Sequence, residues 1–328
     1  MSRPYVVYGE ELSLFTRKLE AALNFYDADY VRKPKTAQNA GWIEARSGTH
    51  QVPVLQTPED WMLADTTPLI RMLDGRFPAR RMFPTGLIGL LVHILEEYFD
   101  EWVSRVMVHY RWHYPESARF ASRRIGGDNE SAVEYMLDWG PRACRATGTE
   151  PQHQRDAAES EYLGILEAAE AQLKQSAYLL GDRPTALDCI VLGGLRAHTN
   201  MDPDPKRIVA GFPAVLEWCE TRADQWDGGG DLAEFSEPTP FAQYVLNEMP
   251  STYSPFALGN RDAQAAGEKT FQVDIYGEPV SYLSRAYPER SRQMLVAHIG
   301  QFERRERETA KHWLRSIGLG DTFSDGHM

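Results

Sequence analysis

The first eighty residues combine short apolar runs with one amphipathic segment, a pattern typical of a small α/β domain. Residues 4–8 form an apolar, β-prone run that Gly9 ends. Behind it, apolar side chains at positions 15, 19, 22, 23 and 26 follow the period of a helix. The sequence therefore predicts a strand, a turn and a helix, with Ser13 at or next to the N-terminus of that helix.

Short apolar runs return after residue 50 and complete the predicted domain. Residues 51–55 place Pro53 at the head of an apolar strand, where its missing N–H does not interrupt the ladder. The run at 61–64 is followed by Asp65 and Thr66, which have the character of helix caps. A helix with an early, tolerated proline is predicted behind them.

A long helix is predicted from residue 87. Apolar side chains recur at helical spacing up to Val106 and lead into an aromatic segment at 109–114. His109 and His113 are four residues apart, a spacing that suits a shared metal ion. No third ligand stands at a suitable spacing, so we predict no metal site.

A capping box is predicted at the head of a later apolar helix. Thr185 and Asp188 are three residues apart, so each side chain can bond the N–H of the other residue. We therefore interpret Asp188 as structural and not catalytic.

The last hundred residues follow a flexible break at Gly228-Gly229-Gly230. The alternation at 270–275 and the return at 280–283 predict a hairpin, and one charged helix is predicted from 288 to 317. No catalytic motif appears here. Capping of an active-site cleft, a wider dimer interface and partner binding are all compatible with this extension.

Composition narrows the possible partners. The chain has 328 residues, a net charge of −12 and a pI near 5.3, which argue against nucleic acid and anionic membranes as partners. Glu10 and Glu11 stand where a signal peptide would be apolar, and the most apolar stretch, 86–95, is too short to span a membrane. Three cysteines without a Cys-x-x-Cys pair suggest a reducing, cytoplasmic location.

Several of these segments resemble one family. Residues 12–23 resemble the serine-type segment of glutathione transferases, Val52–Pro53 resembles the family's Val-Pro pair with its cis bond, and Asp65–Thr66 resembles its Glu-Ser or Asp-Ser pair. Residues 178–188 and 212–218 are similar to helix starts in the family's helical domain. The chain is identified as a member of this family over roughly residues 4–226. Leu14 in place of proline, Asp65 in place of glutamate and Thr66 in place of serine are departures.

The resemblance implies a fold and its domains. We expect a thioredoxin-like α/β domain at 1–80 and an all-α domain at 85–227, followed by a small α+β extension at 231–328. It also implies a cytoplasmic homodimer.

The resemblance further implies a glutathione site. Ser13 would stabilise the thiolate, with Tyr8 as the alternative, because a hydroxyl at a helix N-terminus lowers a thiol pKa. Val52 and Pro53 would hold the cysteinyl part, and Asp65 and Thr66 the γ-glutamyl end. The candidates for the glycyl carboxylate are Gln51, Lys33 and Lys35. The alternative is that three of these residues only cap helices, namely Ser13, Asp65 and Thr66.

A second site is implied in the helical domain. Tyr98, Trp102, His109 and Trp112 are candidate contacts for an apolar or aromatic cosubstrate, and a place in the core or at a dimer face is the alternative. The expected enzyme conjugates glutathione, its cosubstrate, to a hydrophobic electrophile or uses it to cleave one. The alternative is a transferase-like binding or assembly protein that keeps the fold.

Overall fold

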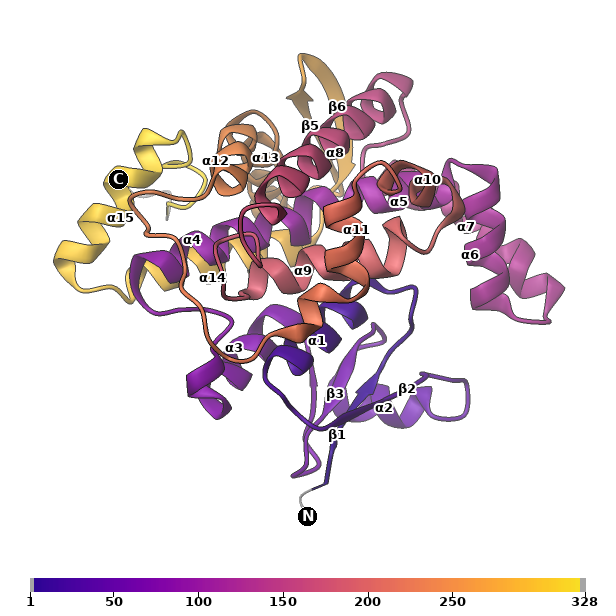
Figure 1. Cartoon of the computed structure of the whole chain (residues 1–328). Helices are drawn as coiled ribbons and strands as arrows, with labels where there is room; N and C mark the ends of the chain where they lie inside the picture. The colour runs from indigo at the N-terminus through magenta and orange to yellow at the C-terminus, as the bar shows by residue number, and fades with distance from the viewer. Residues whose placement is uncertain (1–2, 325–328) are drawn as a thin grey trace. The chain divides into compact units, whose positions relative to one another are not determined.

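The computed structural model describes residues 3–324, which form two compact units. The first unit combines residues up to 84 with residues 173–232, and the second combines residues 85–172 with those from 233 onward. Each unit therefore contains segments that are far apart in the sequence (Figure 1). The division into domains at 1–80, 85–227 and 231–328 stays a prediction.

The first unit contains a small mixed sheet, as the sequence predicts. Its strand order is β2-β1-β3-β4, with β1 parallel to β2 and antiparallel to β3, which is antiparallel to β4. The four strands are β1 (Tyr5–Tyr8), β2 (Tyr30–Lys33), β3 (Val54–Gln56) and β4 (Met62–Ala64). Val7, Val54 and Leu55 are fully buried, which explains why the apolar runs form the centre of this sheet.

Helices complete the first unit. They are α1 (Leu14–Phe25), α2 (Ala40–Ser47), α3 (Thr66–Arg76), α9 (Ala186–Gly194), α10 (Pro203–Val209) and α11 (Pro213–Glu220), with the short 3-10 helices η1 (Pro78–Arg80) and η4 (Arg222–Gln225) and the π-type segment η3 (Leu195–Thr199). α1 packs closely against α9 (Figure 1). A Cβ at Gly193 would lie 2.7 Å from the carbonyl oxygen of Leu14, so this close approach requires glycine.

The predicted capping box is present at α9. Asp188 is fully buried and accepts from the N–H groups of Thr185, at 2.8 Å, and Leu179, at 2.9 Å. Burial raises the pKa of Asp188 to about 6. Its structural role follows from these contacts, because both oxygens are taken by the backbone.

Replacing Thr185 and Asp188 together by alanine should destabilise the protein by at least about 2 kcal/mol, since buried N–H groups lose their acceptors. Thermal unfolding measures this loss. Asp231→Ala removes an exposed carboxylate of the same unit and should change the melting temperature little. A double variant that melts like wild type but loses turnover would show that the carboxylate acts in the chemistry.

The second unit is mainly helical. It contains α4 (Gly86–Glu97), η2 (Tyr98–Val103), α5 (Ser104–Trp112), α6 (Pro115–Gly126), α7 (Glu130–Ala146), most of α8 (Gln152–Leu173), α12 (Pro240–Glu248), η5 (Met249–Ser251), α13 (Tyr253–Ala266), α14 (Ala286–Gly300) and α15 (Arg304–Ser316). The predicted helix from residue 87 to 106 is confirmed, and a π-type segment, η2, joins α4 to α5 within it. No helix in residues 3–324 is both long and apolar enough to cross a membrane.

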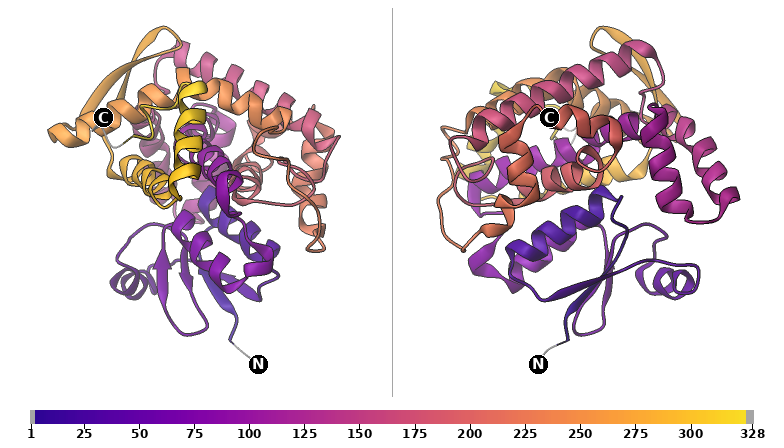
Figure 2. Two further views of the ribbon diagram at one scale, coloured as in Figure 1. Left: turned by 90° about the vertical axis from the view of Figure 1, so that its left-hand side faces the viewer. Right: turned by 45° about the vertical axis from the view of Figure 1, so that its right-hand side comes forward.

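The extension forms part of this second unit from residue 233 onward. The predicted hairpin is confirmed as β5 (Thr270–Ile275) and β6 (Glu278–Leu283), and Figure 2 shows it beside α13. The single charged helix predicted from 288 to 317 is wrong, because the chain leaves helical geometry between α14 and α15. Phe302 in this break is buried, so the turn places an aromatic side chain in the core.

Candidate functional site

The strand register brings four segments to one end of the sheet. Tyr8, the last residue of β1, lies opposite both Lys33 of β2 and Val54 of β3, and Val54 lies opposite Ala64 of β4. The chain therefore leaves β1, β2 and β4 and enters β3 at this same end. The segments that connect to the strands at this end contain the candidate site residues predicted from the sequence.

Two helices begin at this end of the sheet. α1 starts directly after Ser13, and α3 starts directly after Asp65. The first turn of a helix has unbonded N–H groups and a partial positive charge, and both favour an anionic ligand group. The arrangement thus offers two separate positions for negative charge.

Ser13 is half-buried at the start of α1. Its Oγ accepts from the N–H of Thr16 at 3.3 Å, which is the predicted cap. Among the residues that the structure describes, no acceptor takes the Ser13 hydroxyl proton, so it is available to a ligand. Gly9 permits this turn, because a Cβ there would lie 2.4 Å from the Thr16 side-chain oxygen.

Tyr8 is held differently. Its ring is 7% exposed, and its hydroxyl donates to the Gln56 side chain at 3.2 Å. Burial and the charge of Asp60 raise the pKa of Tyr8. The Tyr8 hydroxyl therefore already has a partner, whereas the Ser13 hydroxyl is free to donate.

The Val52–Pro53 peptide bond is cis, as the resemblance implies. Val52 is half-buried and lies outside the paired register, which begins at Val54. Its N–H and C=O make no hydrogen bond to another described residue. They form a short strand edge that an extended ligand can pair with.

Asp65 has a backbone conformation that is unusual for its residue type. Its φ of 72° lies in the left-handed region that favours glycine. Its side chain makes no capping hydrogen bond to α3, which corrects the expectation that it caps this helix. A residue held in a rarely populated conformation at a helix start is a candidate for ligand binding.

Lys18 is a residue that sequence reasoning missed. It is fully buried in α1, and its Nζ donates to Thr67 Oγ1 of α3 at 2.9 Å. The bond connects the second turn of α1 to the first turn of α3, the two helices that begin at this end of the sheet. The available signal was its position three residues after Phe15, on the apolar face of α1.

Two segments of the chain match family models. Residues 7–81 match the N-terminal domain of glutathione S-transferases, and residues 152–221 match their C-terminal domain. The chain belongs to the glutathione S-transferase family. The transferase assignment made from its sequence is therefore confirmed.

Solved structures of transferases and related enzymes are similar to parts of this fold. The β-etherase LigF from Sphingobium sp. strain SYK-6 is 13% identical with a TM-score of 0.50, covering 69% of this chain and 97% of that one. A glutathione S-transferase from Rhodospirillum rubrum F11 is 15% identical with a TM-score of 0.47, covering 73% of this chain and 99% of that one. At such identity the β-etherase structure supports the fold alone. No curated protein matches the transferase by sequence.

The candidates for the glycyl carboxylate have different surroundings in this transferase. Lys33 is exposed at the end of β2. Lys35 donates to the carbonyl oxygen of His50 at 2.5 Å and pairs with Glu44 at 2.8 Å, while Gln51 is exposed. Lys33 and Gln51 are thus more accessible than Lys35.

The candidates for the electrophile pocket lie in the second unit. Tyr98 and Trp102 are buried and donate to the Glu161 carboxylate at 2.9 and 2.8 Å. His109 is buried, with its two ring nitrogens 2.7 Å from His113 and 2.7 Å from Glu159. Trp112 is half-buried against Trp139.

Their role in a substrate pocket stays a prediction. Burial and the bonds to Glu161 give Tyr98 and Trp102 a structural role. The described residues contain no group of three side chains that could hold a metal ion.

Proposed function

We propose that this transferase binds glutathione at the end of the sheet where α1 and α3 begin, and that the Ser13 hydroxyl donates to the thiolate. The observation that carries this proposal is the free hydroxyl of Ser13 at the N-terminus of α1, on the same sheet end as Val52 and Asp65. A thiol of pKa near 8.5 is mostly protonated at neutral pH, and helix N-termini lower such values to about 3.5–7.5. Ser13 and α1 together supply the stabilisation that the thiolate needs.

The other segments at this end of the sheet would position the tripeptide. The N–H and C=O of Val52 pair with the cysteinyl residue, since they form an open strand edge. The Asp65 carboxylate takes the γ-glutamyl ammonium, and Thr66 with the N-terminus of α3 takes the neighbouring carboxylate. Lys33, with Gln51, is favoured for the glycyl carboxylate because it is exposed and extends from the end of β2.

The proposed reaction is a nucleophilic substitution. The glutathione sulfur forms a C–S bond with an electrophilic carbon, and the leaving group departs with the electron pair of the bond that breaks. Conjugation and reductive cleavage share this first step. A binding or assembly protein without turnover is the second candidate, and it predicts glutathione binding without thiolate stabilisation. Homodimer formation and a cytoplasmic location also stay proposals.

Calorimetry with glutathione tests the site. We expect a dissociation constant in the micromolar to millimolar range, about −4 to −8 kcal/mol. Asp65→Ala should weaken binding by at least about tenfold, because a hydrogen bond to a charged group contributes roughly 1.5–3 kcal/mol. No heat and no thermal shift at millimolar glutathione would refute the proposal.

Asp60→Ala provides a matched control for Asp65→Ala. Asp60 has the same φ of 72°, but it lies in the turn between β3 and β4, at the other end of these strands. Glutathione affinity should therefore stay unchanged in this variant. Equal losses in both variants would mean that the effect comes from the backbone of the domain and not from a carboxylate that contacts glutathione.

A further inference from the structure

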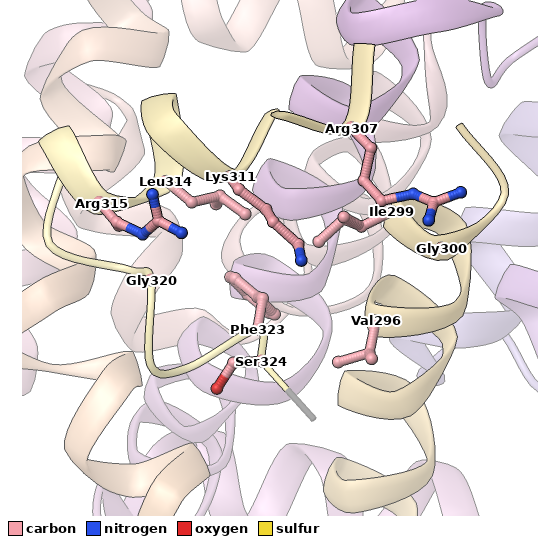
Figure 3. Close-up of a pocket in the computed structure, with 10 residues that line it drawn as sticks. All are labelled: Val296, Ile299, Gly300, Arg307, Lys311, Leu314, Arg315, Gly320, Phe323 and Ser324. Atoms are coloured by element: carbon pink, nitrogen blue, oxygen red, sulfur yellow. The ribbon is translucent and has the colours of Figure 1, made fainter. Parts of the chain in front are cut away.

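A small cavity lies in the second unit, between α14, α15 and the segment that follows α15. Its volume is about 180 Å³ (Figure 3). It is lined by Val296, Ile299, Gly300, Arg307, Lys311, Leu314, Arg315, Gly320, Phe323 and Ser324. All of these residues follow the two segments that match the transferase family, so the family's own chemistry does not account for the cavity.

The floor of the cavity is apolar and fixed in place. Ile299, Leu314 and Phe323 are each less than 5% exposed. The segment that carries Phe323 is anchored by the buried Arg292, which donates to the carbonyl oxygens of Thr322, at 2.9 Å, and Ser324, at 3.2 Å. The apolar floor is therefore already formed before a ligand binds, and this reduces the entropic cost of binding.

The rim of the cavity is basic. Arg307, Lys311 and Arg315 are spaced four residues apart on α15, so they share one face of the helix. Figure 3 shows the Lys311 ammonium near Ile299 and Phe323, with Arg307 and Arg315 on either side of it. The ten lining residues include no aspartate or glutamate.

The cations on the rim make few polar contacts with the residues that the structure describes. Within residues 3–324, neither the Lys311 side chain nor the Arg315 side chain makes a hydrogen bond or an ion pair. Arg307 donates from Nη2 to the carbonyl oxygen of Phe302 at 2.7 Å, but its buried Nε–H has no hydrogen-bond partner in the described part of the chain. Positive charge that has no acidic partner among the described residues, in a chain of net charge −12, favours an anionic ligand.

We propose that this cavity binds a small carboxylic acid whose apolar body is a single ring or a short aliphatic chain. Its carboxylate would pair with Lys311, flanked by Arg307 and Arg315, and its body would contact Ile299 and Phe323. The size agrees, because an apolar cavity of about 150 Å³ accommodates benzene. A phosphate ion would leave the apolar floor unused, and a neutral ring would leave the cations unpaired.

Benzoate is the probe that tests this proposal, titrated into the full chain without glutathione and followed by NMR. We expect saturation with a dissociation constant on the order of 1 mM, as befits so small a ligand. Benzyl alcohol, of similar shape but uncharged, and inorganic phosphate should each bind at least about tenfold more weakly. Added salt should weaken benzoate binding because charges near the surface are screened.

Variants of Lys311 test whether its ammonium group binds the carboxylate of benzoate. Lys311→Met keeps the apolar stem and should lower benzoate affinity about tenfold, whereas Lys311→Arg should retain it. Lys269→Met makes the same chemical change at an exposed lysine outside the cavity and should leave affinity unchanged. Equal benzoate binding by Lys311→Met and wild type, or equal binding of benzyl alcohol or phosphate, would overturn the proposal. The proposal would also be overturned if no binding were detected at roughly 20 mM benzoate, a concentration 20-fold above the expected dissociation constant. None of these outcomes depends on the glutathione site.

Discussion

Ser13→Ala should remove most of the thiolate absorbance of bound glutathione at neutral pH and slow turnover about ten- to hundredfold. The lost hydrogen bond to a charged sulfur is worth roughly 1.5–3 kcal/mol, and this corresponds to a rise of about one to two units in the pKa of the bound thiol. Ultraviolet titration of the saturated complex measures that pKa. The rate loss should shrink as the pH rises, because the thiolate then forms without help.

Three further variants give this experiment its controls. Ser13→Thr keeps a hydroxyl at the same helix start and should retain most of the thiolate signal. Tyr8→Phe should change it little, because the Tyr8 hydroxyl is bonded to Gln56. The reverse pattern, with the signal lost in Tyr8→Phe and kept in Ser13→Ala, would assign the thiol contact to Tyr8.

Ser13→Ala also removes a helix cap, and this second effect must be separated from the first. The Ser13 oxygen accepts from the N–H of Thr16, so alanine should cost about 0.5–2 kcal/mol of stability. A melting curve measures that loss independently of glutathione. An unchanged thiol pKa together with a lowered melting temperature would mean that Ser13 serves only as a cap.

The sequence predicts the first unit well because its signals are local. Strand lengths, the helix behind Ser13 and the position of Pro53 all follow from patterns within a few residues. Local patterns do not reveal the register that brings Tyr8, Lys33, Val54 and Ala64 to one end of the sheet. That juxtaposition depends on pairing between distant strands, and in the sequence only the family resemblance indicated it.

Side-chain partners were harder to predict than backbone elements. The position of Lys18 on the apolar face of α1 was a local sign of burial, but its partner Thr67 is 49 positions away and no local pattern identifies it. The family resemblance made Tyr98 and Trp102 candidates for pocket contacts, with a place in the core or at a dimer face as the alternative. Both side chains donate to Glu161, which is about sixty positions away in the chain, and the helical spacing of apolar residues does not predict this contact. The break before α15 was missed because its charged residues continue a helical pattern on both sides.

The extension is also tied to the family's helical segment in a way that the sequence did not indicate. Tyr276, at the turn between β5 and β6, donates to Glu161 of α8 at 2.7 Å. Its φ of 55° lies in the left-handed region, which is uncommon for an aromatic residue. The hairpin therefore supplies one of the donors around a buried carboxylate in the part of the chain that matches the family.

Glu161 is the centre of this buried polar cluster. Its side chain is fully buried and accepts from Tyr98, Trp102, Arg105 and Tyr276. The Arg105 guanidinium is itself buried and lies 4.1 Å from the centre of the Trp102 ring. A carboxylate in such a place is stabilised by its donors, and the arginine is stabilised by the carboxylate.

Glu161→Ala should therefore be among the most destabilising single substitutions in this chain. It leaves a buried arginine and three polar hydrogens without their acceptor, and removal of one partner of a buried pair costs about 3–5 kcal/mol. The melting temperature should fall by on the order of 10 °C. Glu167→Ala removes an exposed carboxylate from the same helix and should change it by no more than about 2 °C.

Tyr276→Phe separates the contribution of the extension from that of the whole cluster. It removes a single donor and should cost about 1–3 kcal/mol, less than Glu161→Ala, while leaving the Arg105 pair intact. If Tyr276→Phe melts like wild type while Glu161→Ala unfolds early, the hairpin contributes nothing to the cluster's stability. If Glu161→Ala melts like wild type but loses turnover, the cluster belongs to the electrophile pocket, and the role predicted for Tyr98 and Trp102 in substrate binding gains direct support.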